Sequence, residues 1–394
     1  MVGVDGLALF VAGSPVAGLA SATGPLVAAR TVQGIGAALA VPATLALIGT
    51  MYPPGRARTR ALGVLAAMTS AGVISGVLLG GLVTEVAGWR WVFLMVVPPA
   101  LAAALAAPRV LPEGRAEGAA GPPDLAGGLL GPAAVMLLVY ALTRLEAPGR
   151  GLVSAALSGV AGLVLLAGFV AWERRAPAPL LRPGILSIRS LRGATLGAAA
   201  NSGSFTAVVF VGTLYLQTGL GYPPLQAGLA VLPLDLVAAV VGFTAGRLLA
   251  GRSPRAAAVA AFLASAAAMG WLARAPVPAS YATDVLPALL VFGVSAAVGF
   301  VILTGQAVAD VGPDEQGLAS GVFETANHLG GGAAAVALYA TVIALVAGEG
   351  AAGPEALARG YGAAFLAAAG LAVLGAAGAW QLHGQGGWPT DRGG

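Results

Sequence analysis

Apolar residues occupy the chain in blocks of about twenty, and short runs rich in Pro, Gly and Arg separate one block from the next. A helix that rises 1.5 Å per residue needs about twenty apolar residues to cross roughly 30 Å of hydrocarbon. The blocks are apolar throughout rather than alternating, which argues against the strands of a membrane β-barrel. The pattern therefore predicts an all-α fold, a polytopic membrane helical bundle with about twelve spans. We place these spans at about residues 4–22, 25–50, 61–84, 90–107, 125–143, 152–172, 192–217, 226–248, 255–273, 283–309, 317–347 and 360–382.

Composition supports a chain whose surface lies mostly in a lipid bilayer. Charged residues make up 9% and hydrophobic residues 58% of the 394 positions, whereas a soluble protein carries about 25% charged residues. The net charge of +4 lies in short loops between the apolar blocks, so we expect no nucleic-acid partner. The chain contains no cysteine, which excludes disulfides and thiolate metal sites.

The distribution of arginine predicts which side of the membrane each loop faces. All twenty basic residues are arginine, and one of them, Arg30, lies inside a span. Fourteen others fall on one side: Arg56, Arg58, Arg60, Arg109, Arg115, Arg174, Arg175, Arg182, Arg189, Arg192, Arg247, Arg252, Arg255 and Arg392. Five fall on the other: Arg90, Arg144, Arg150, Arg274 and Arg359. Because arginine-rich short loops stay in the cytoplasm, we expect a multi-pass protein of the inner (cytoplasmic) membrane with both termini cytoplasmic.

An arginine motif lies in the second predicted span, which reads Arg30-Thr-Val-Gln33-Gly34-Ile-Gly36. This stretch resembles motif B of the major facilitator superfamily, found in the fourth helix of its proton-driven members. A guanidinium group inside a bilayer is costly, so Arg30 should face a polar cavity and have a partner there. The alternative is an arginine near a helix end whose side chain reaches the water.

Glycines recur four residues apart in the third predicted span, at Gly72, Gly76 and Gly80, and Gly81 follows directly. The run resembles motif C, the antiporter signature of the superfamily's fifth helix, with Val77 in place of the family's proline. Glycines at this spacing share a helix face and let another backbone approach closely. The valine leaves open whether the helix bends there as it does in the family.

Three further stretches extend the resemblance along the chain. Residues 88–93 read Gly-Trp-Arg-Trp-Val-Phe, residues 221–226 read Gly-Tyr-Pro-Pro-Leu-Gln, and residues 320–331 end in Asn-His-Leu-Gly-Gly. The first is characteristic of the fourteen-span drug:proton antiporters, the EmrB/QacA-like family, and its tryptophans also suit an interfacial anchor. The other two resemble the tenth and thirteenth helices of that family. The chain is similar to this family nearly from end to end, which implies the major facilitator fold.

The resemblance also predicts how the chain maps onto the family. Motif B belongs to the fourth family helix but lies in the second span here, so the chain aligns from the third family helix onward and lacks counterparts of the first two. We expect a partial N-terminal lobe of four spans over residues 1–110, an inserted helix pair over 111–190, and a C-terminal lobe of six spans over 191–394. A start codon assigned too late and a genuine truncation both explain this, and the first is favoured.

Few ionisable side chains lie well inside the predicted spans: Arg30, Asp235, Glu324 and His328. A carboxyl group in a medium of low dielectric can take up and release a proton near physiological pH, as proton antiport requires. Glu324 and His328 are four residues apart, so they share a helix face and form a candidate proton-accepting pair. We take all four residues as proton-coupling candidates. The alternatives are a packing role for Asp235 and a polar contact between helices for Glu324 with His328.

Polar and aromatic side chains in the seventh predicted span are candidates for a substrate cavity: Asn201, Phe205, Phe210, Tyr215 and Gln217. An aromatic, sparsely polar pocket suits lipophilic substrates. The alternative is that these aromatic rings contact lipid or the protein core.

Enzyme and metal motifs are not found in the sequence. Two histidines do not make a zinc site without neighbours at ligand spacing, so we expect no metal. The chain contains no lysine, so it lacks the Gly-x-x-x-x-Gly-Lys phosphate loop, which excludes ATP-driven transport by this chain alone. We expect no enzyme activity and no cofactor, with the proton gradient as the energy source. The oligomeric state stays open, with a monomer as the expectation.

The resemblance implies a proton-coupled secondary transporter that exports small amphipathic drugs or toxic compounds across the bacterial cytoplasmic membrane. One alternative keeps the mechanism and changes the cargo, to a dedicated exporter of one natural product or metabolite. The other is a truncated, non-transporting remnant of such an exporter.

Overall fold

The structure is a computed structural model that describes residues 2–51, 68, 72, 75–76, 79–110, 124–144, 151–176, 179–180, 184–249, 251–276, 279–312, 315–348 and 353–382. These residues form helices joined by turns, and none of them lies in a β-strand. The predicted all-α class is therefore confirmed. The predictions for Arg56, Arg58, Arg60, Arg115, Arg150, Arg182 and Arg392, and for most of the third span, lie outside the described residues.

The chain divides into two compact units. Unit 1 comprises Met1–Ala119 together with Pro223–Leu229, and unit 2 comprises Ala120–Tyr222 together with Ala230–Gly394. This division does not test the predicted lobe boundaries at residues 110 and 190, which stay predictions.

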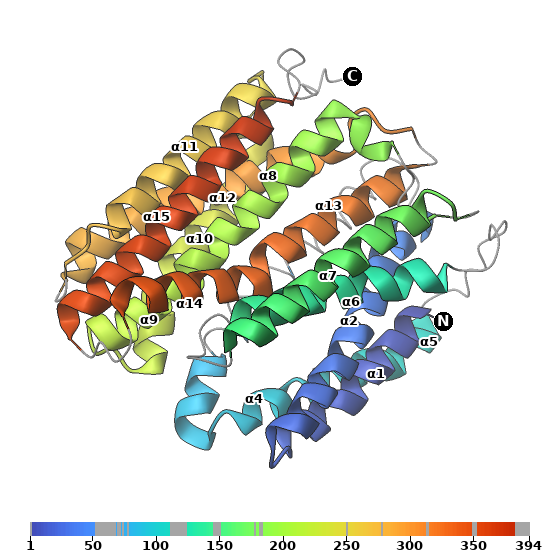
Figure 1. Ribbon diagram of the computed structural model, residues 1–394, viewed down its shortest axis with the longest axis horizontal. Coiled ribbons are helices and arrows are strands. Elements are labelled where there is room, and N and C mark those ends of the chain that lie inside the picture. The colour runs from blue at the N-terminus through green and yellow to red at the C-terminus, as the bar shows by residue number, and fades with distance from the viewer. Residues whose placement is uncertain are drawn as a thin grey trace. The chain divides into compact units, whose positions relative to one another are not determined.

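Unit 1 is built on a close pair of helices. Its helical elements are α1 Val2–Gly18, α2 Thr23–Met51, a helix over residues 79–87, α4 Arg90–Met95 and α5 Val97–Val110 (Figure 1). α1 packs along α2 and also contacts α4 and α5. A side-chain carbon placed on Gly36 would lie 2.5 Å from the carbonyl oxygen of Gly6. The two backbones can therefore approach closely only because both residues are glycine, as small residues permit in membrane helices.

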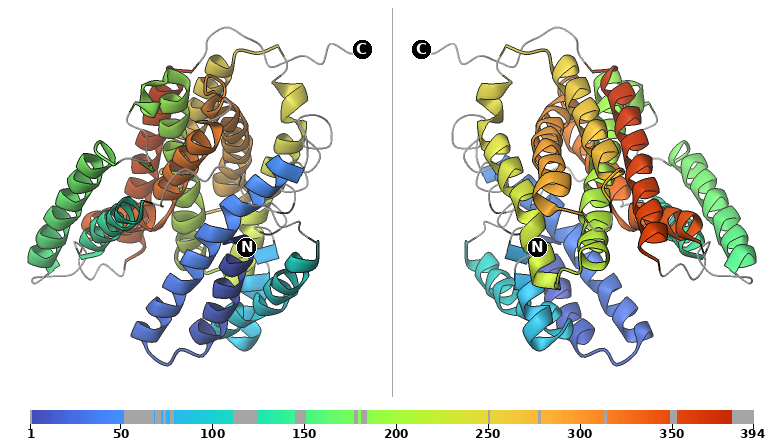
Figure 2. Two further views of the ribbon diagram at one scale, coloured as in Figure 1. Left: turned by 90° about the vertical axis from the view of Figure 1, so that its right-hand side faces the viewer. Right: turned by 90° about the vertical axis from the view of Figure 1, so that its left-hand side faces the viewer.

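Unit 2 begins with α6 Leu125–Arg144 and α7 Gly151–Glu173, which pack along each other. A short 3₁₀ turn, η1 Ile185–Ser187, precedes a long span made of α8 Arg189–Thr206, η2 Ala207–Val211, α9 Gly212–Leu214 and η3 Tyr215–Gly219. The later elements are α10 Pro224–Leu248, α11 Pro254–Leu272, η4 Tyr281–Val285, α12 Leu286–Ala307, α13 Gln316–Gly331, α14 Ala333–Ala347 and α15 Pro354–Ala379. The first residues of α10, up to Leu229, belong to unit 1. Figure 2 shows α7 at the margin of this unit, with α6 between α7 and α14.

Nine helical segments among the described residues are long and apolar enough to cross a membrane. They are Arg90–Val110, Leu125–Leu142, Gly151–Glu173, Arg189–Gly219, Pro224–Thr244, Pro254–Leu272, Tyr281–Ala307, Leu318–Ala347 and Glu355–Ala379. Each coincides with a predicted span, and Gly3–Gly18 is a shorter apolar helix at the first one. The polytopic membrane bundle predicted from the apolar blocks is confirmed for this part of the chain.

Unit 2 buries aromatic side chains in its core and exposes many leucine side chains on α6 and α7. Phe262, Phe292 and Phe365 are at most 2% exposed. By contrast, Leu129 on α6 and Leu157 on α7 are exposed by 72% and 68%. An exposed leucine face is expected where a helix contacts lipid tails, because lipid is as apolar as the side chain.

A polar clasp joins one end of α6 to one end of α7. Asp124 directly precedes α6, and its Oδ1 atom accepts hydrogen bonds from the backbone N–H of Gly127 and from the indole N–H of Trp172, both at 2.9 Å. These two donors, the Gly127 amide first, lower the pKa of the Asp124 carboxyl group from its ordinary value. Asp124 therefore caps α6 and ties it to the last turn of α7.

Candidate functional site

The predicted span over residues 317–347 is interrupted near its middle. α13 ends at Gly331, Gly332 is extended with φ −82° and ψ −153°, and α14 begins at Ala333. A single continuous helix was expected there, and the glycine run explains the difference because glycine weakens a helix. Discontinuous membrane helices expose backbone carbonyl groups, and such breaks often lie beside substrate or ion sites in transporters.

The break lies directly against α8. Gly330 faces the backbone of Ala199, and Gly331 faces the side chain of Ser202, with no room for a side chain on either glycine. Thr206 Oγ1 donates a hydrogen bond to the carbonyl oxygen of Gly331 at 2.5 Å. An exposed carbonyl is costly in an apolar medium, so Thr206 supplies the partner that the interrupted helix lacks.

A buried tyrosine makes the second polar link between these elements. The hydroxyl group of Tyr339 on α14 donates to the carbonyl oxygen of Gly203 on α8 at 3.0 Å, and Tyr339 is fully buried. The bond fixes α14 on the far side of the break, just as Thr206 fixes the end of α13. Both halves of the interrupted helix are therefore held to α8.

The span that begins with α8 is itself irregular. Two π-helical segments follow Thr206, at Ala207–Val211 and Tyr215–Gly219. Each π turn widens the helix and shifts the following side chains around the axis, and such segments are frequent at functional sites. The first one begins at the residue after Thr206, so the irregular part of this span faces the break in its neighbour.

A cavity of about 550 Å³ lies between the two irregular helices. It is lined by Ser202, Phe205, Thr206, Val209, Phe210, Thr213, Leu214, Gly331 and Val336. Two aromatic rings and several aliphatic groups make up most of this wall, with three hydroxyl groups among them. A cavity of this size and character suits a drug-sized, largely apolar molecule with a few hydrogen-bonding groups.

The structure places the predicted cavity residues differently from one another. Phe205 and Phe210 line the cavity. Asn201 instead donates from Nδ2 to the carbonyl oxygen of Ala296 on α12 at 3.4 Å. Tyr215 turns its hydroxyl group to the carbonyl oxygen of Pro276 at 2.5 Å. Gln217 is half-buried and is not in the lining of this cavity, so substrate contact by Asn201, Tyr215 and Gln217 stays a prediction.

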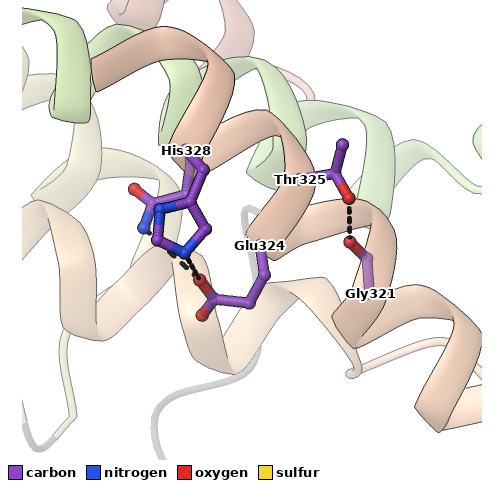
Figure 3. A network of polar contacts seen from close by, with 5 residues as sticks. Gly321, Glu324, Thr325 and His328 are labelled. Carbon is purple, nitrogen blue, oxygen red and sulfur yellow. Dashed lines mark hydrogen bonds and ion pairs between the residues drawn. The ribbon is translucent and has the colours of Figure 1, made fainter. Parts of the chain in front are cut away.

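Glu324 and His328 share one face of α13, as their spacing predicts (Figure 3). Glu324 Oε2 lies 3.8 Å from His328 Nε2, and Asn327 Nδ2 donates to the same oxygen at 3.5 Å. The side chains of His328 and Glu324 are exposed by 79% and 41%. The two side chains are therefore close to each other, whereas their role as a proton-accepting pair stays a prediction. The contacts of Glu324 are long enough for a stronger partner to compete with them.

Asp235 is half-buried in the middle of α10 and has no hydrogen-bond or ion-pair partner among the described residues. The preceding residue, Leu234, packs its backbone against α12, where a side-chain carbon on Gly293 would lie 2.7 Å from the Leu234 carbonyl oxygen. No described contact joins Asp235 to Glu324 or His328. The structure thus gives Asp235 no packing bond and does not test its predicted role in proton coupling.

Motif B forms a chain of hydrogen bonds in unit 1. Arg30 Nη1 donates to Gln33 Oε1 at 3.1 Å, and Gln33 Nε2 donates to Ser14 Oγ at 2.6 Å. Ser14 Oγ in turn donates to the carbonyl oxygen of Phe10 at 2.8 Å. Gln33 is 3% exposed, so it connects the exposed Arg30 on α2 to the interior of the α1–α2 pair.

The two most specific motifs of the sequence meet in this unit. The Arg30 guanidinium carbon lies 5.4 Å from the centre of the Phe93 ring, within cation–π distance. Phe93 ends the run Gly88-Trp-Arg-Trp-Val-Phe. Of the motif B glycines, Gly36 faces α1 closely, whereas Gly34 has no atom within 4 Å of the position of a side-chain carbon. Arg30 therefore contacts a residue of each motif, whereas the polar cavity that it was expected to face stays a prediction.

Of the four motif C glycines, one has a neighbouring helix within 4 Å among the described residues. A side-chain carbon on Gly81 would lie 3.5 Å from the Cα atom of Leu225, at the start of α10. For Gly72, Gly76 and Gly80 no such neighbour lies within 4 Å in the described part of the chain. Gly81 is thus in ordinary van der Waals contact with Leu225, and the close backbone approach expected from the glycine spacing stays a prediction.

Comparison with known proteins identifies the family. Residues 4–335 match the Major Facilitator Superfamily. The chain belongs to this superfamily. Its irregular α8 and α13–α14 spans are therefore parts of a transporter bundle.

Three bacterial proteins are among the chain's relatives. Puromycin resistance protein pur8 of Streptomyces alboniger is 39% identical over 346 residues, covering 86% of this chain and 67% of the relative. Cephamycin export protein CmcT of Amycolatopsis lactamdurans is 34% identical over 373 residues, covering 92% of this chain and 74% of the relative. The tetracenomycin C resistance and export protein of Streptomyces glaucescens is 29% identical, covering 84% of this chain and 61% of the relative.

Several residues that line the cavity beside α8 are not predicted from the sequence. Thr206, Thr213 and Gly331 line it. The sequence predicts neither threonine, and Gly331 belongs to a stretch that resembles the family's thirteenth helix without a predicted role in the cavity. The signal that was present is the run of three glycines at 330–332 inside an apolar span. Such a run marks a weak point of a helix, and its cross-helix neighbour then becomes a candidate for the lining.

Proposed function

We propose that this protein is a proton-coupled secondary transporter that exports a small, amphipathic, antibiotic-like compound across the bacterial inner membrane. The observation that carries the proposal is the 550 Å³ cavity between the π-helical part of the α8 span and the break at Gly332. Its aromatic and aliphatic walls with a few hydroxyl groups suit an amphipathic cargo. Its place beside a discontinuous helix suits a transport site that opens and closes by helix movement.

The relatives support the class of cargo. Their names associate them with puromycin, cephamycin and tetracenomycin C, one antibiotic for each protein. This pattern favours a dedicated exporter of one natural product over an exporter of many unrelated drugs. Some of these relatives are named for resistance and others for export. Removing an antibiotic from the cell gives resistance to it, so both names fit one transport function.

The finer assignment rests on the motifs. Motif B and the Gly-Trp-Arg-Trp run support membership of the fourteen-span drug:proton antiporters, with alignment from the third family helix onward. The arginine distribution supports cytoplasmic termini. Protons flowing inward supply the energy, and Arg30, Asp235, Glu324 and His328 are the coupling candidates. We take the protein to act as a monomer without a cofactor or metal.

Transport in everted membrane vesicles tests this proposal. The chain is expressed in a bacterium that lacks its main drug exporters, and a fluorescent pH probe reports the acid interior of the vesicles. Puromycin, a cephamycin and tetracenomycin C are then added one at a time. An antiporter moves its substrate inward and protons outward in such vesicles, so at least one compound should partly dissipate the gradient.

Matched variants separate transport from membrane insertion. Phe205→Ala removes a ring from the cavity and should weaken the response, whereas Leu163→Ala changes a lipid-facing residue of α7 that is 59% exposed and should leave it unchanged. If the protein is present in the membrane in normal amount and no compound alters the gradient, the export proposal fails. That result would favour the alternative of a non-transporting remnant.

A further inference from the structure

A second cavity lies on a different side of the interrupted helix. It measures about 430 Å³ and is lined by Val135, Met136, Val139, Tyr140, His328, Leu329 and Ala334. The first four residues belong to α6, and the others come from the end of α13 and the start of α14. None of these seven residues lines the cavity beside α8, so the two cavities are distinct.

The helix break explains why this space exists. α6 packs along α14, while the extended residue Gly332 turns α13 away from the line of α14. Among the described residues, the α6 side chains beside the break are only partly covered. Met136 is 64% exposed and Tyr140 is 43% exposed, and both belong to the wall of the cavity.

Charged groups of opposite sign flank this cavity. His328 is the ionisable residue in the α13 wall, and Glu324 lies one turn earlier on the same face, 3.8 Å from it. On α6, Arg144 Nε donates to the hydroxyl group of Tyr140 at 2.8 Å, and its guanidinium lies 4.8 Å from the ring centre. On α14, the hydroxyl group of Tyr339 donates to the Gly203 carbonyl of α8 and so does not face this cavity.

The order of these charges along the cavity follows from chain direction. α6 and α13 lie in the fifth and eleventh predicted spans, so both run from the same side of the membrane. Glu324 precedes the cavity residues of α13, and Arg144 follows those of α6. The carboxylate therefore lies toward one end of the cavity and the guanidinium toward the opposite end.

We infer that the cavity between α6 and the α13–α14 break binds a lipophilic amine, with its apolar body against Met136, Tyr140 and Leu329 and its ammonium group on Glu324. A cation is drawn toward Glu324 and away from Arg144, which sets the orientation of the ligand. The carboxylate is available because its contacts with His328 and Asn327 are 3.8 and 3.5 Å long, longer than a charge-assisted hydrogen bond of about 2.8 Å.

The inference deepens the proposed function, because a lipophilic amine is one kind of amphipathic cargo that an exporter would take from the membrane. The wall from α6 means that the helix pair α6–α7 contributes to ligand binding. Since Gly331 lines the first cavity and Ala334 the second, both ligands contact the same break. Occupancy of the second cavity is expected to favour one arrangement of that break.

Equilibrium binding of a fluorescent lipophilic amine tests the inference. The full chain is placed in nanodiscs of phosphatidylethanolamine and phosphatidylglycerol and titrated with dansylcadaverine, a primary amine. N-hexyl dansylamide, which has the same fluorophore and no charge, is titrated in parallel. We expect saturable binding of the amine, and Glu324→Gln should weaken it by about tenfold, the usual size for a hydrogen bond to a charged group. The uncharged probe should bind equally well to both proteins.

A filled cavity gives an independent reading. Met136→Trp places a large side chain in the space and should abolish the part of the amine binding that depends on Glu324. Leu129→Trp, on the lipid-facing part of the same helix, where Leu129 is 72% exposed, should leave it unchanged. Phe205→Ala, in the first cavity, should leave the Glu324-dependent part of the amine binding unchanged, which distinguishes the site from the proposed transport cavity.

Two outcomes would overturn the inference. One is amine binding that survives both Met136→Trp and Glu324→Gln at unchanged affinity. The other is loss of both probes alike in Met136→Trp with no effect of Glu324→Gln, which would indicate a groove for a lipid acyl chain. Because the readout is binding, it stands even if vesicle transport fails, and loss of the site would leave the export proposal intact.

Discussion

The hydroxyl group of Thr206 donates a hydrogen bond to the carbonyl oxygen of Gly331, across the contact between α8 and the end of α13. The last carbonyl groups of any helix lack donors within the helix, and Gly331 is the last residue of α13. Thr206 is also the last α-helical residue before the π segment that begins at Ala207. One hydrogen bond thus connects the two backbone irregularities that border the proposed substrate cavity.

Thr206→Val tests the value of this bond. The substitution keeps the shape of the side chain and removes the donor, so the Gly331 carbonyl loses its partner in an apolar setting. We expect a loss of about 1 kcal/mol of stability together with reduced transport, measured by thermal unfolding in detergent and by vesicle efflux. Thr304→Val is the matched control, because Thr304 donates only to the carbonyl of Phe300 in its own helix at 2.8 Å. Equal effects of the two substitutions would contradict a special role for Thr206.

Gly330→Ala should be more damaging than any nearby glycine substitution. Its new methyl group would overlap the backbone of Ala199 on α8, and a backbone cannot rotate away as a side chain can. Overpacking of this kind typically costs about 1–3 kcal/mol. Gly321→Ala, also in α13, meets no atom within 4 Å and should be neutral or slightly stabilising. The melting temperatures of the two variants decide the matter, and similar values would mean that α8 and α13 are not packed closely there.

Much of the bundle is readable from the apolar blocks alone. The predicted span 125–143 corresponds to the helix Leu125–Arg144, and the predicted span 192–217 corresponds to the helical segment Arg189–Gly219. Length and hydropathy suffice for this, because lipid requires an unbroken apolar stretch with internally bonded backbone.

The site was less predictable, because it depends on local departures from helix geometry. Hydropathy does not distinguish an α-helix from one with π turns, so the positions of Phe205 and Tyr215 relative to one another were not predictable. Tyr215 follows the first π segment and points to the Pro276 carbonyl instead of the cavity. Likewise, the α6 wall beside His328 comes from a helix almost two hundred residues away, and neither periodicity nor a local motif connects them.

Neutral replacements of the two intramembrane acids test proton coupling. Asp235→Asn and Glu324→Gln keep the size of each side chain and remove its ability to exchange a proton. We expect each variant to insert into the membrane normally and to lose proton-coupled efflux, measured as substrate-dependent dissipation of the pH gradient in everted vesicles. Wild-type efflux by both variants would show that the assignment of the coupling acids is wrong.

Arg30→Lys should impair function although the positive charge remains. A guanidinium can lie over the Phe93 ring while it donates to Gln33, but an ammonium group lacks this planar geometry. In a double-mutant cycle, Arg30→Lys and Phe93→Leu should therefore be coupled by about 0.5–1 kcal/mol in stability. Arg109→Lys, where Arg109 donates to the carbonyl of Leu105 in its own helix, is the control. Strict additivity of the Arg30 and Phe93 changes would indicate that the two side chains do not interact.

The Asp124 clasp predicts a dependence of stability on pH. The Gly127 amide and the Trp172 indole lower the pKa of Asp124 in the folded protein, whereas the unfolded chain has the ordinary value of about 3.9. A lowered folded-state pKa means that the ionised clasp stabilises the protein fully above the unfolded pKa, and that this contribution is lost as the pH falls through the folded pKa.

Trp172→Phe removes the second donor, so the pKa of Asp124 should rise toward its ordinary value. Thermal unfolding measured from pH 6 to pH 3 should then show a smaller acid-dependent loss than in the wild type. Trp271→Phe is the control, because its indole donates to a backbone carbonyl, that of Asp284. An unchanged pH profile in Trp172→Phe would mean that the Trp172 indole does not lower the pKa of Asp124.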